Sequence, residues 1–263
     1  MKTILVATDF SMPASNALFY AGRLAESIQA SVIILHVYQL PISMNEVPAL
    51  LVSAEGLREY AELNLEKSRL TLLKVHPDLQ VRTESRLGDV VDELNELSEK
   101  LDPFAIVIGR SGSNAMKRVL FGSTTLAIIR KSRFPVIAVP HSAAGLSFHN
   151  IALAVDDLNE EVPAQQIKLT LDPLKGNIHM VHVQPNRSGS LEADRLANEL
   201  NSTFTTIRDD EFLHGIQSYV RNNNIDLLVI LPHRHSLIER MFLKTHTAEL
   251  MQELSLPILC INT

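Results

Sequence analysis

The sequence predicts an α/β fold of two tandem units, each a parallel sheet with helices on both faces. Short apolar runs alternate with amphipathic stretches along the chain, and the second half repeats the apolar runs of the first. A short segment of small residues separates the halves. Alternating strands and helices favour a parallel sheet, because the connecting helices then cover its faces. The 46% of apolar residues is enough for a core in each unit.

The first unit is expected in the order strand, helix, strand, helix, strand, helix, strand, helix, strand. Apolar runs that predict strands lie at 4–9, 32–37, 104–108 and 134–139. Amphipathic stretches that predict helices lie at 14–29, 55–75, 89–101 and 124–132. Each unit is therefore a doubly wound, five-stranded sheet.

The chain repeats this order once, which predicts a second unit of the same fold. The repeated runs pair 4–9 with 151–156, 32–37 with 178–183, 102–108 with 224–230 and 134–139 with 256–261. The last two pairs share an offset of 122 residues without a gap. The segment 140–149 has no strong periodicity and predicts a linker. We expect domains at 1–142 and 149–263, with a reduced helix near 191–200.

A phosphate-binding motif is predicted where the fourth strand of the first unit ends. Gly109 and Gly112 follow that strand, and Gly122, Ser123 and Thr124 come just before a helix. Glycine lets backbone N–H groups approach an anion, and a helix start supplies unpaired N–H groups. Residues 110–133 carry six bases and no acid, which favours an anionic ligand. The alternative is a solvated basic helix after an ordinary glycine turn.

The second unit lacks this motif. At the offset of 122, leucine, arginine and lysine replace the three glycines, at Leu231, Arg234 and Lys244. The segment 232–255 also balances its bases with acids. One nucleotide site per chain is therefore expected, in the first unit.

With these residues, the chain resembles the universal stress protein family in its tandem two-domain form. Gly109, Gly112, Gly122 and Ser123 match the family signature G-2x-G-9x-G-[ST] at every spacing. The resemblance implies a strand order of 3-2-1-4-5 and a bound ATP, or AMP or ADP. Asp9 would face the ribose, the phosphates or a Mg²⁺ ion. The implied contacts are with adenine at Val37 and Ala7–Thr8–Asp9, with ribose at Gly109 and Arg110, and with phosphates at Gly112, Ser113, Gly122, Ser123 and Thr124.

Three functions stay open at this point. The first is an ATP-binding stress-response or signalling module without fast turnover, acting on an unknown protein partner. The second is slow Mg²⁺-dependent ATP hydrolysis or phosphotransfer, in which Asp9 would orient the metal or water. The third is an adaptor that holds no nucleotide. No catalytic residue and no metal ligand is assigned.

Charge and composition exclude other classes. The net charge is −6, and the excess acid lies in residues 146–263, so a general basic surface for nucleic acid is not expected. No apolar run approaches the length of a membrane span, and the chain has one cysteine, Cys260, so we expect a cytoplasmic protein.

The final strands, 136–139 and 258–261, are expected at sheet edges, where they would join the units as an internal pseudo-dimer. Pairing of whole chains into a homodimer is a further possibility.

Histidines outside the motif have simpler interpretations. His36 and His182 end apolar strands at matching places, so structural hydrogen bonds are expected for both. His233, His235 and His246 fit no standard zinc spacing and are interpreted as surface residues rather than a metal cluster.

Overall fold

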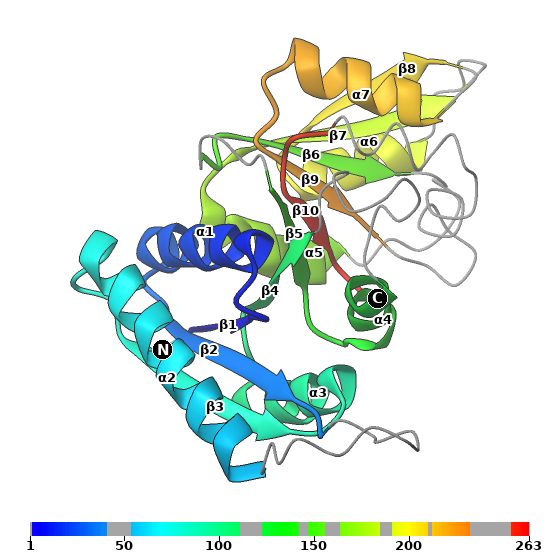
Figure 1. Ribbon diagram of the computed structural model, residues 1–263. Coiled ribbons are helices and arrows are strands. Elements are labelled where there is room, and N and C mark those ends of the chain that lie inside the picture. The colour runs from blue at the N-terminus through cyan, green and yellow to red at the C-terminus, as the bar shows by residue number, and fades with distance from the viewer. Residues whose placement is uncertain are drawn as a thin grey trace.

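A single ten-stranded sheet runs through both halves of the chain (Figure 1). The computed structural model describes residues 2–40, 54–110, 123–141, 147–155, 164–184, 191–209, 212–231 and 254–262. The strand order is β3-β2-β1-β4-β5-β10-β9-β6-β7-β8. Each half has the order 3-2-1-4-5 when its own strands are counted, as predicted.

The first repeat contains five parallel strands and four helices. Its strands are β1 (Thr3–Ala7), β2 (Ser31–Tyr38), β3 (Val81–Leu87), β4 (Ala105–Arg110) and β5 (Val136–Pro140). Its helices are α1 (Met12–Ile28), α2 (Ala54–Val75), α3 (Val90–Leu101) and α4 (Ser123–Lys131). The four strands and four helices predicted by range are all present, with ends shifted by a few residues, and β3 is the remaining strand of the predicted order.

The second repeat has the same strand order with shorter helices. Its strands are β6 (Asn150–Val155), β7 (Asn177–Gln184), β8 (Thr203–Arg208), β9 (Leu227–Ile230) and β10 (Ile258–Cys260). Its described helices are α5 (Ala164–Leu171), the 3₁₀ turn η1 (Asp172–Leu174), α6 (Leu191–Glu199) and α7 (Phe212–Asn222). The predicted reduced helix near 191–200 is α6. The proposed domain boundary between 142 and 149 stays a prediction, because residues 142–146 lie outside the described part.

The two repeats meet where β5 and β10 pair in antiparallel fashion (Figure 1). Cys260 lies opposite Val136, and Ile258 lies opposite Ala138. These four residues are buried, at 0–1% exposure. The predicted pairing of the two final strands is therefore confirmed.

Two apolar layers enclose this sheet, and each extends across both repeats. One layer joins α1 and α2 to α5 and α6. The other joins α3 and α4 to α7. Because both faces of the central strands are covered, these strands are continuous apolar runs rather than alternating ones.

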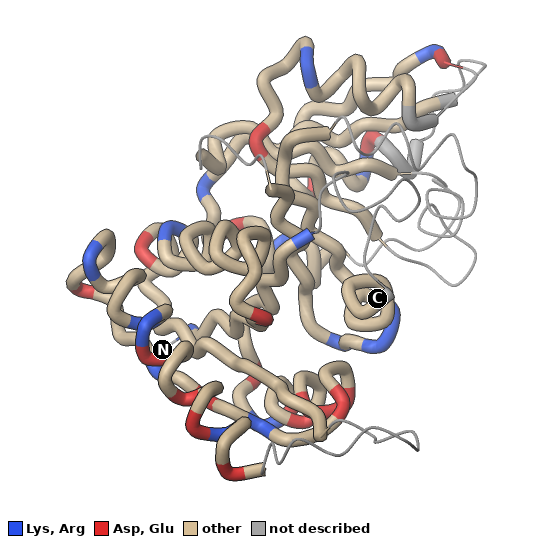
Figure 2. Tube along the Cα trace, in the orientation of Figure 1, with Lys and Arg blue, Asp and Glu red and all other residues tan. Residues whose placement is uncertain are grey.

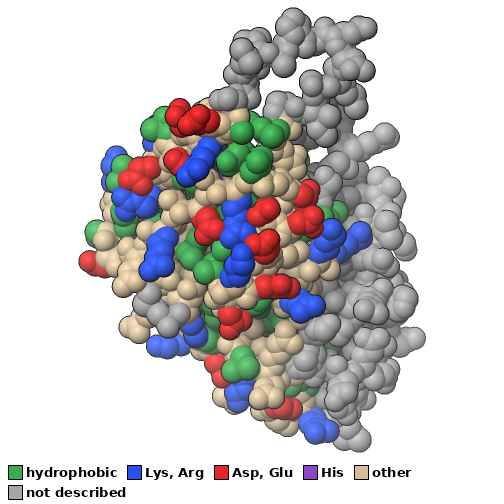
Figure 3. Space-filling model, turned by 90° about the horizontal axis from the view of Figure 1, so that it is seen from below, with side chains coloured by type: hydrophobic (Ala, Val, Ile, Leu, Met, Phe, Trp, Pro, Cys, Tyr) green, Lys and Arg blue, Asp and Glu red, His purple; other side chains and the backbone are tan. Residues whose placement is uncertain are grey.

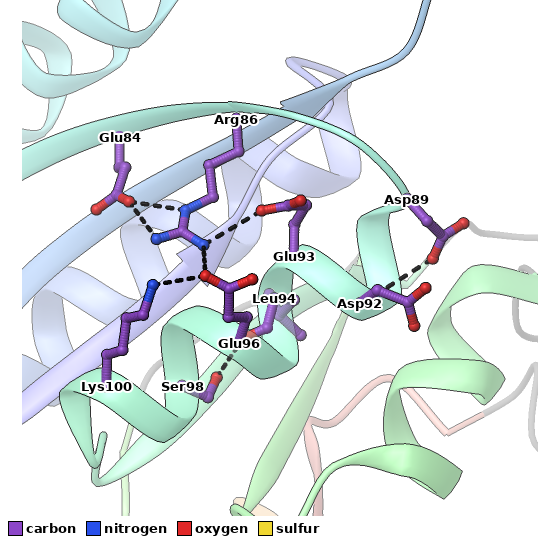
Figure 4. Close-up of polar contacts among 9 residues, drawn as sticks. All are labelled: Glu84, Arg86, Asp89, Asp92, Glu93, Leu94, Glu96, Ser98 and Lys100. Carbon is purple, nitrogen blue, oxygen red and sulfur yellow. Dashed lines mark hydrogen bonds and ion pairs between the residues drawn. The ribbon is translucent and has the colours of Figure 1, made fainter.

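Local signals in the sequence explain where the helices begin and end. Ser11 accepts a hydrogen bond from the Ala14 N–H and so caps α1, with Pro13 in its first turn. Asp89 accepts from the N–H groups of Val91 and Asp92 and caps α3 (Figure 4). Gln29 and Asp102 end α1 and α3 in the left-handed conformation.

The outer strand β3 carries charged side chains rather than an apolar run. Arg86 bonds Glu84 on its own strand and Glu93 and Glu96 on α3, and Lys100 also bonds Glu96 (Figure 4). Charged side chains on an edge strand oppose pairing with another sheet. Acidic and basic side chains also intermix along α2 (Figure 2) and on the face seen from below (Figure 3). Among the described residues, no helix is long and apolar enough to cross a bilayer.

The exposed edge left by removing the second repeat gives a test of this architecture. We expect residues 1–142, expressed alone, to dimerise or aggregate, because the buried backbone of β5 loses its partner strand. Sedimentation velocity measures the association state of the fragment at a protein concentration on the order of tens of micromolar, where weak complexes form. The full chain is the control. A stable, soluble monomer of the fragment would contradict it.

Candidate functional site

Six of the residues predicted to contact a nucleotide lie where β1, β2 and β4 end at one edge of the sheet: Ala7, Thr8, Asp9, Val37, Gly109 and Arg110. Ala7, at the end of β1, pairs with Ile108 on β4 and with Leu35 on β2. Gly109 directly follows Ile108. The predicted grouping of the β1 end with the glycine motif depended on β1 and β4 being neighbours, and they are neighbours.

The turn after β1 is held by two of the predicted residues. Thr8 Oγ1 accepts a hydrogen bond from the Phe10 N–H at 3.0 Å, and Asp9 Oδ1 accepts from the Ser11 N–H at 3.0 Å. Phe10 has a φ of 64°, in the left-handed region that non-glycine residues rarely adopt. One carboxylate oxygen of the exposed Asp9 is therefore committed to the turn.

Aromatic rings pack beside this turn. The rings of Phe10 and His36 have centroids 4.3 Å apart, and Tyr60 of α2 meets Phe10 edge-on at 6.4 Å. Val37, the predicted adenine contact, follows His36 on β2 and is half-buried. The end of β2 thus presents apolar and aromatic side chains next to the β1 turn.

His36 closes the base of the turn through its Nδ1 atom, 2.8 Å from the Thr8 carbonyl oxygen. A carbonyl oxygen only accepts, so Nδ1 carries the hydrogen. His182 makes the same bond in the second repeat, with Nδ1 2.8 Å from the Val155 carbonyl oxygen. The predicted structural role of both histidines is confirmed, and it ties the second strand of each repeat to the end of the first.

Gly109 is required by packing as well as by its place in the motif. A Cβ atom on Gly109 would lie 2.5 Å from the carbonyl carbon and oxygen of Pro13 and 2.7 Å from the Ala14 nitrogen. All three atoms are backbone atoms in the first turn of α1, so they have no side-chain freedom to move away. The sequence assigned this glycine to the nucleotide motif and missed the packing of α1 on β4.

Arg110 has a partner that the sequence did not predict. Its side chain is buried, at 5% exposure, and Nη2 donates to the Leu254 carbonyl oxygen at 2.8 Å. Burial lowers the pKa of Arg110 to about 10, which leaves it charged at neutral pH. The predicted contact of Arg110 with ribose stays a prediction.

The second half of the motif is only partly described. Gly112, Ser113 and Gly122 lie outside the described residues. Ser123 begins α4, and Thr124 is exposed in its first turn. The first N–H groups of a helix have no partner within the helix, so the start of α4 suits an anion.

Two of the bases in 110–133 have partners outside the segment. Arg110 is buried against Leu254, and Lys131 lies 3.8 Å from Asp92 of α3. Both members of the second pair are exposed, so that contact contributes little free energy. Among the described bases of the segment, Arg130, Lys131 and Arg133 are exposed.

The second repeat differs at the position equivalent to Gly109. Leu231 follows β9 there and is buried, at 5% exposure. Its side chain belongs to the apolar layer that includes α5 and α6. Within the described part of the chain, no group of three or more His, Cys, Asp and Glu residues comes together as metal ligands would. His233, His235 and His246 lie outside that part.

We expect Gly109→Ala to destabilise the protein by about 2 kcal/mol or more, because its Cβ would overlap backbone atoms. Gly56→Ala, at the exposed start of α2, is the matched control. It should raise the free energy of unfolding by about 1 kcal/mol at most, because alanine favours the helix more than glycine does. Urea denaturation followed by circular dichroism measures both variants. Equal effects at the two positions would contradict the packing role of Gly109.

The bonds of His36 and His182 to carbonyl oxygens predict one tautomer for both rings. Two-bond ¹⁵N–¹H correlation spectra should show the hydrogen on Nδ1 of each neutral ring. His141, which is exposed, serves as the comparison within the same spectrum. A ring of His36 or His182 with its hydrogen on Nε2 would show that the bond is absent.

Comparison with known proteins agrees with this architecture. A sequence model of the Universal stress protein family matches residues 1–140. Universal stress protein Slr1230 from Synechocystis is 25% identical over 294 residues, covering 98% of this chain and 99% of the relative. The crystal structure of a universal stress protein from Archaeoglobus fulgidus matches with a TM-score of 0.74 and 17% identity, over 99% of this chain and 98% of that one. A universal stress protein solved in complex with cAMP is 25% identical and covers 52% of this chain and 96% of its own, with a TM-score of 0.42. The chain described here belongs to the universal stress protein family.

Proposed function

We propose that this protein binds one adenine nucleotide, ATP in the first instance, in its first repeat and acts as a stress-response or signalling module. The observation that carries the proposal is the placement of the motif's two described ends. Gly109 lies near the end of β4, beside the end of β1, and Ser123 begins α4. A phosphate chain bound between them would meet backbone N–H groups at a glycine turn and a helix start.

The described residues can accommodate the rest of the nucleotide. Adenine would bind the backbone at Val37 and at Ala7 to Asp9, next to the apolar rings of Phe10 and His36. Asp9 uses Oδ1 for the turn, so Oδ2 would accept a ribose hydroxyl or bind Mg²⁺. Phosphates would contact Gly112, Ser113, Gly122, Ser123 and Thr124, as the signature implies. AMP or ADP would use the same adenine and ribose contacts.

The proposal includes a cytoplasmic location and an unidentified protein partner that responds to the bound nucleotide. The free, buried thiol of Cys260 supports the location, because cytosolic proteins keep their thiols reduced. Whole chains could also pair by symmetry, as most soluble oligomers do.

Mass spectrometry of ligand released from the purified protein tests the proposal directly. Recovery of an adenine nucleotide supports binding, and a nucleotide-free protein that also fails to bind ATP in calorimetry would leave the adaptor function. Turnover of ATP with Mg²⁺ would instead favour a slow hydrolase or phosphotransferase.

Gly122→Val should abolish nucleotide binding with the fold retained, because a branched side chain would block the approach of phosphate to the backbone. Lys244→Val is the matched control, since Lys244 is the equivalent residue of the second repeat. It should leave affinity unchanged. Isothermal calorimetry should give one site per chain for the wild type and the control. Two equivalent sites, or unchanged affinity in Gly122→Val, would contradict the assignment.

A further inference from the structure

Residues 254–262 of the second repeat contact the first repeat just after Gly109 and at the C-terminal end of α4, the helix that begins at Ser123. The segment includes β10, which runs antiparallel to β5. One end of the segment therefore reaches the carboxyl end of β4, where the motif begins. The other end reaches the C-terminus of α4, the helix that the motif starts (Figure 1).

The contact at the end of β4 is the bond from Arg110 to the Leu254 carbonyl oxygen, at 2.8 Å. Leu254 is buried, at 3% exposure. A hydrogen bond from a charged donor in a desolvated place is stronger than an exposed one. It fixes the residue that immediately follows Gly109.

The contact at α4 is made by Asn262. Its Nδ2 donates to the Ile129 carbonyl oxygen at 2.7 Å and to the Ser132 carbonyl oxygen at 2.5 Å. Gln166 of α5 donates to the Asn262 main-chain oxygen at 2.9 Å and holds it in place. The last carbonyl groups of a helix lack partners within the helix, so Asn262 caps α4 from the other repeat.

The sequence does not repeat the donors of these two contacts at the equivalent positions. At the offset of 122, Pro140 is the equivalent of Asn262 and Pro232 is the equivalent of Arg110. Proline side chains have no hydrogen-bond donor. The side chains at these equivalent positions therefore cannot make the same contacts between the repeats.

We propose that the second repeat is a positioning partner for the nucleotide motif of the first, with Asn262 as the positioning residue for α4. This inference rests on the proposed nucleotide site. Capping the last turn of α4 fixes the helix whose first turn meets the phosphates, so part of the affinity for nucleotide comes from the second repeat. The second repeat can lack the motif glycines, because it acts on the nucleotide site through residues 254–262.

The test uses the full chain and two substitutions at Asn262, a residue outside the nucleotide contacts. Asn262→Asp keeps the size of the side chain but replaces the donor with a carboxylate that faces two carbonyl oxygens. Asn262→Ala removes the donor without adding charge. The matched controls are Asn223→Asp and Asn223→Ala, because Asn223 Nδ2 donates to the Tyr219 carbonyl oxygen of α7 at 2.9 Å within the second repeat.

Two measurements separate positioning from general stability. Hydrogen exchange of α4 without nucleotide should speed up by about tenfold in the Asn262 variants, as expected for one lost hydrogen bond, and more for Asp than for Ala. The Asn223 variants should leave α4 unchanged. Affinity for ATP should fall about fivefold or more in the Asn262 variants and stay constant in the controls.

The outcomes distinguish this inference from the proposed function. Unchanged exchange in α4 would overturn the positioning role whether or not nucleotide binds. Faster exchange with unchanged ATP affinity would overturn the link between the second repeat and binding. If the wild type binds no nucleotide, the proposed function is wrong, and the second repeat cannot contribute to nucleotide affinity. The hydrogen exchange of α4 still decides in that case whether Asn262 positions α4. An Asn262→Gln variant, which keeps the amide donor, should recover part of both losses.

Discussion

The pairing of β5 with β10 is the constraint on which the rest of the structure depends. In each repeat the strand order places the last strand at an edge, although that strand is apolar on both faces. An edge strand presents unpaired N–H and C=O groups, which are costly to bury without partners. Pairing β5 and β10 satisfies these groups and joins the two apolar layers across both repeats. The remaining edges, β3 and β8, are much more exposed.

Close approach of α1 to β4 is the second requirement of the fold. Gly109 allows the first turn of α1 to pack against the end of β4. Further along α1, Tyr20 is buried at 2% exposure and meets Phe148 edge-on at 5.7 Å. The helix that follows the β1 turn therefore contacts both the motif strand and the segment that leads into the second repeat. A substitution in α1 would affect the motif and the junction together.

Much of the fold could be predicted from the sequence because the buried strands are apolar runs that recur in the same order in both halves of the chain. The adjacency of β1 and β4 also followed from the strand order that the family resemblance implied. The ion-pair network of Arg86 was missed because it joins a strand to a helix through side-chain geometry that spacing does not encode. The partner of Arg110 was missed because Leu254 lies 144 residues away in the chain. The count of bases in 110–133 did not show that the side chain of Arg110 is buried, although it keeps its charge at neutral pH.

The two repeats differ in the conditions that their sequences must meet. The first has to keep Gly109, because a Cβ there would overlap the backbone of α1, and this holds even without a ligand. The second can bury Leu231 at that position and still form the same strand order. It must still supply an apolar β10 and the carbonyl and amide groups at its two ends. These requirements fall on 254–262 rather than on the equivalents of the motif glycines. A repeat that has lost those glycines can therefore remain necessary to the protein, because the first repeat's edge strand and the end of α4 both depend on it.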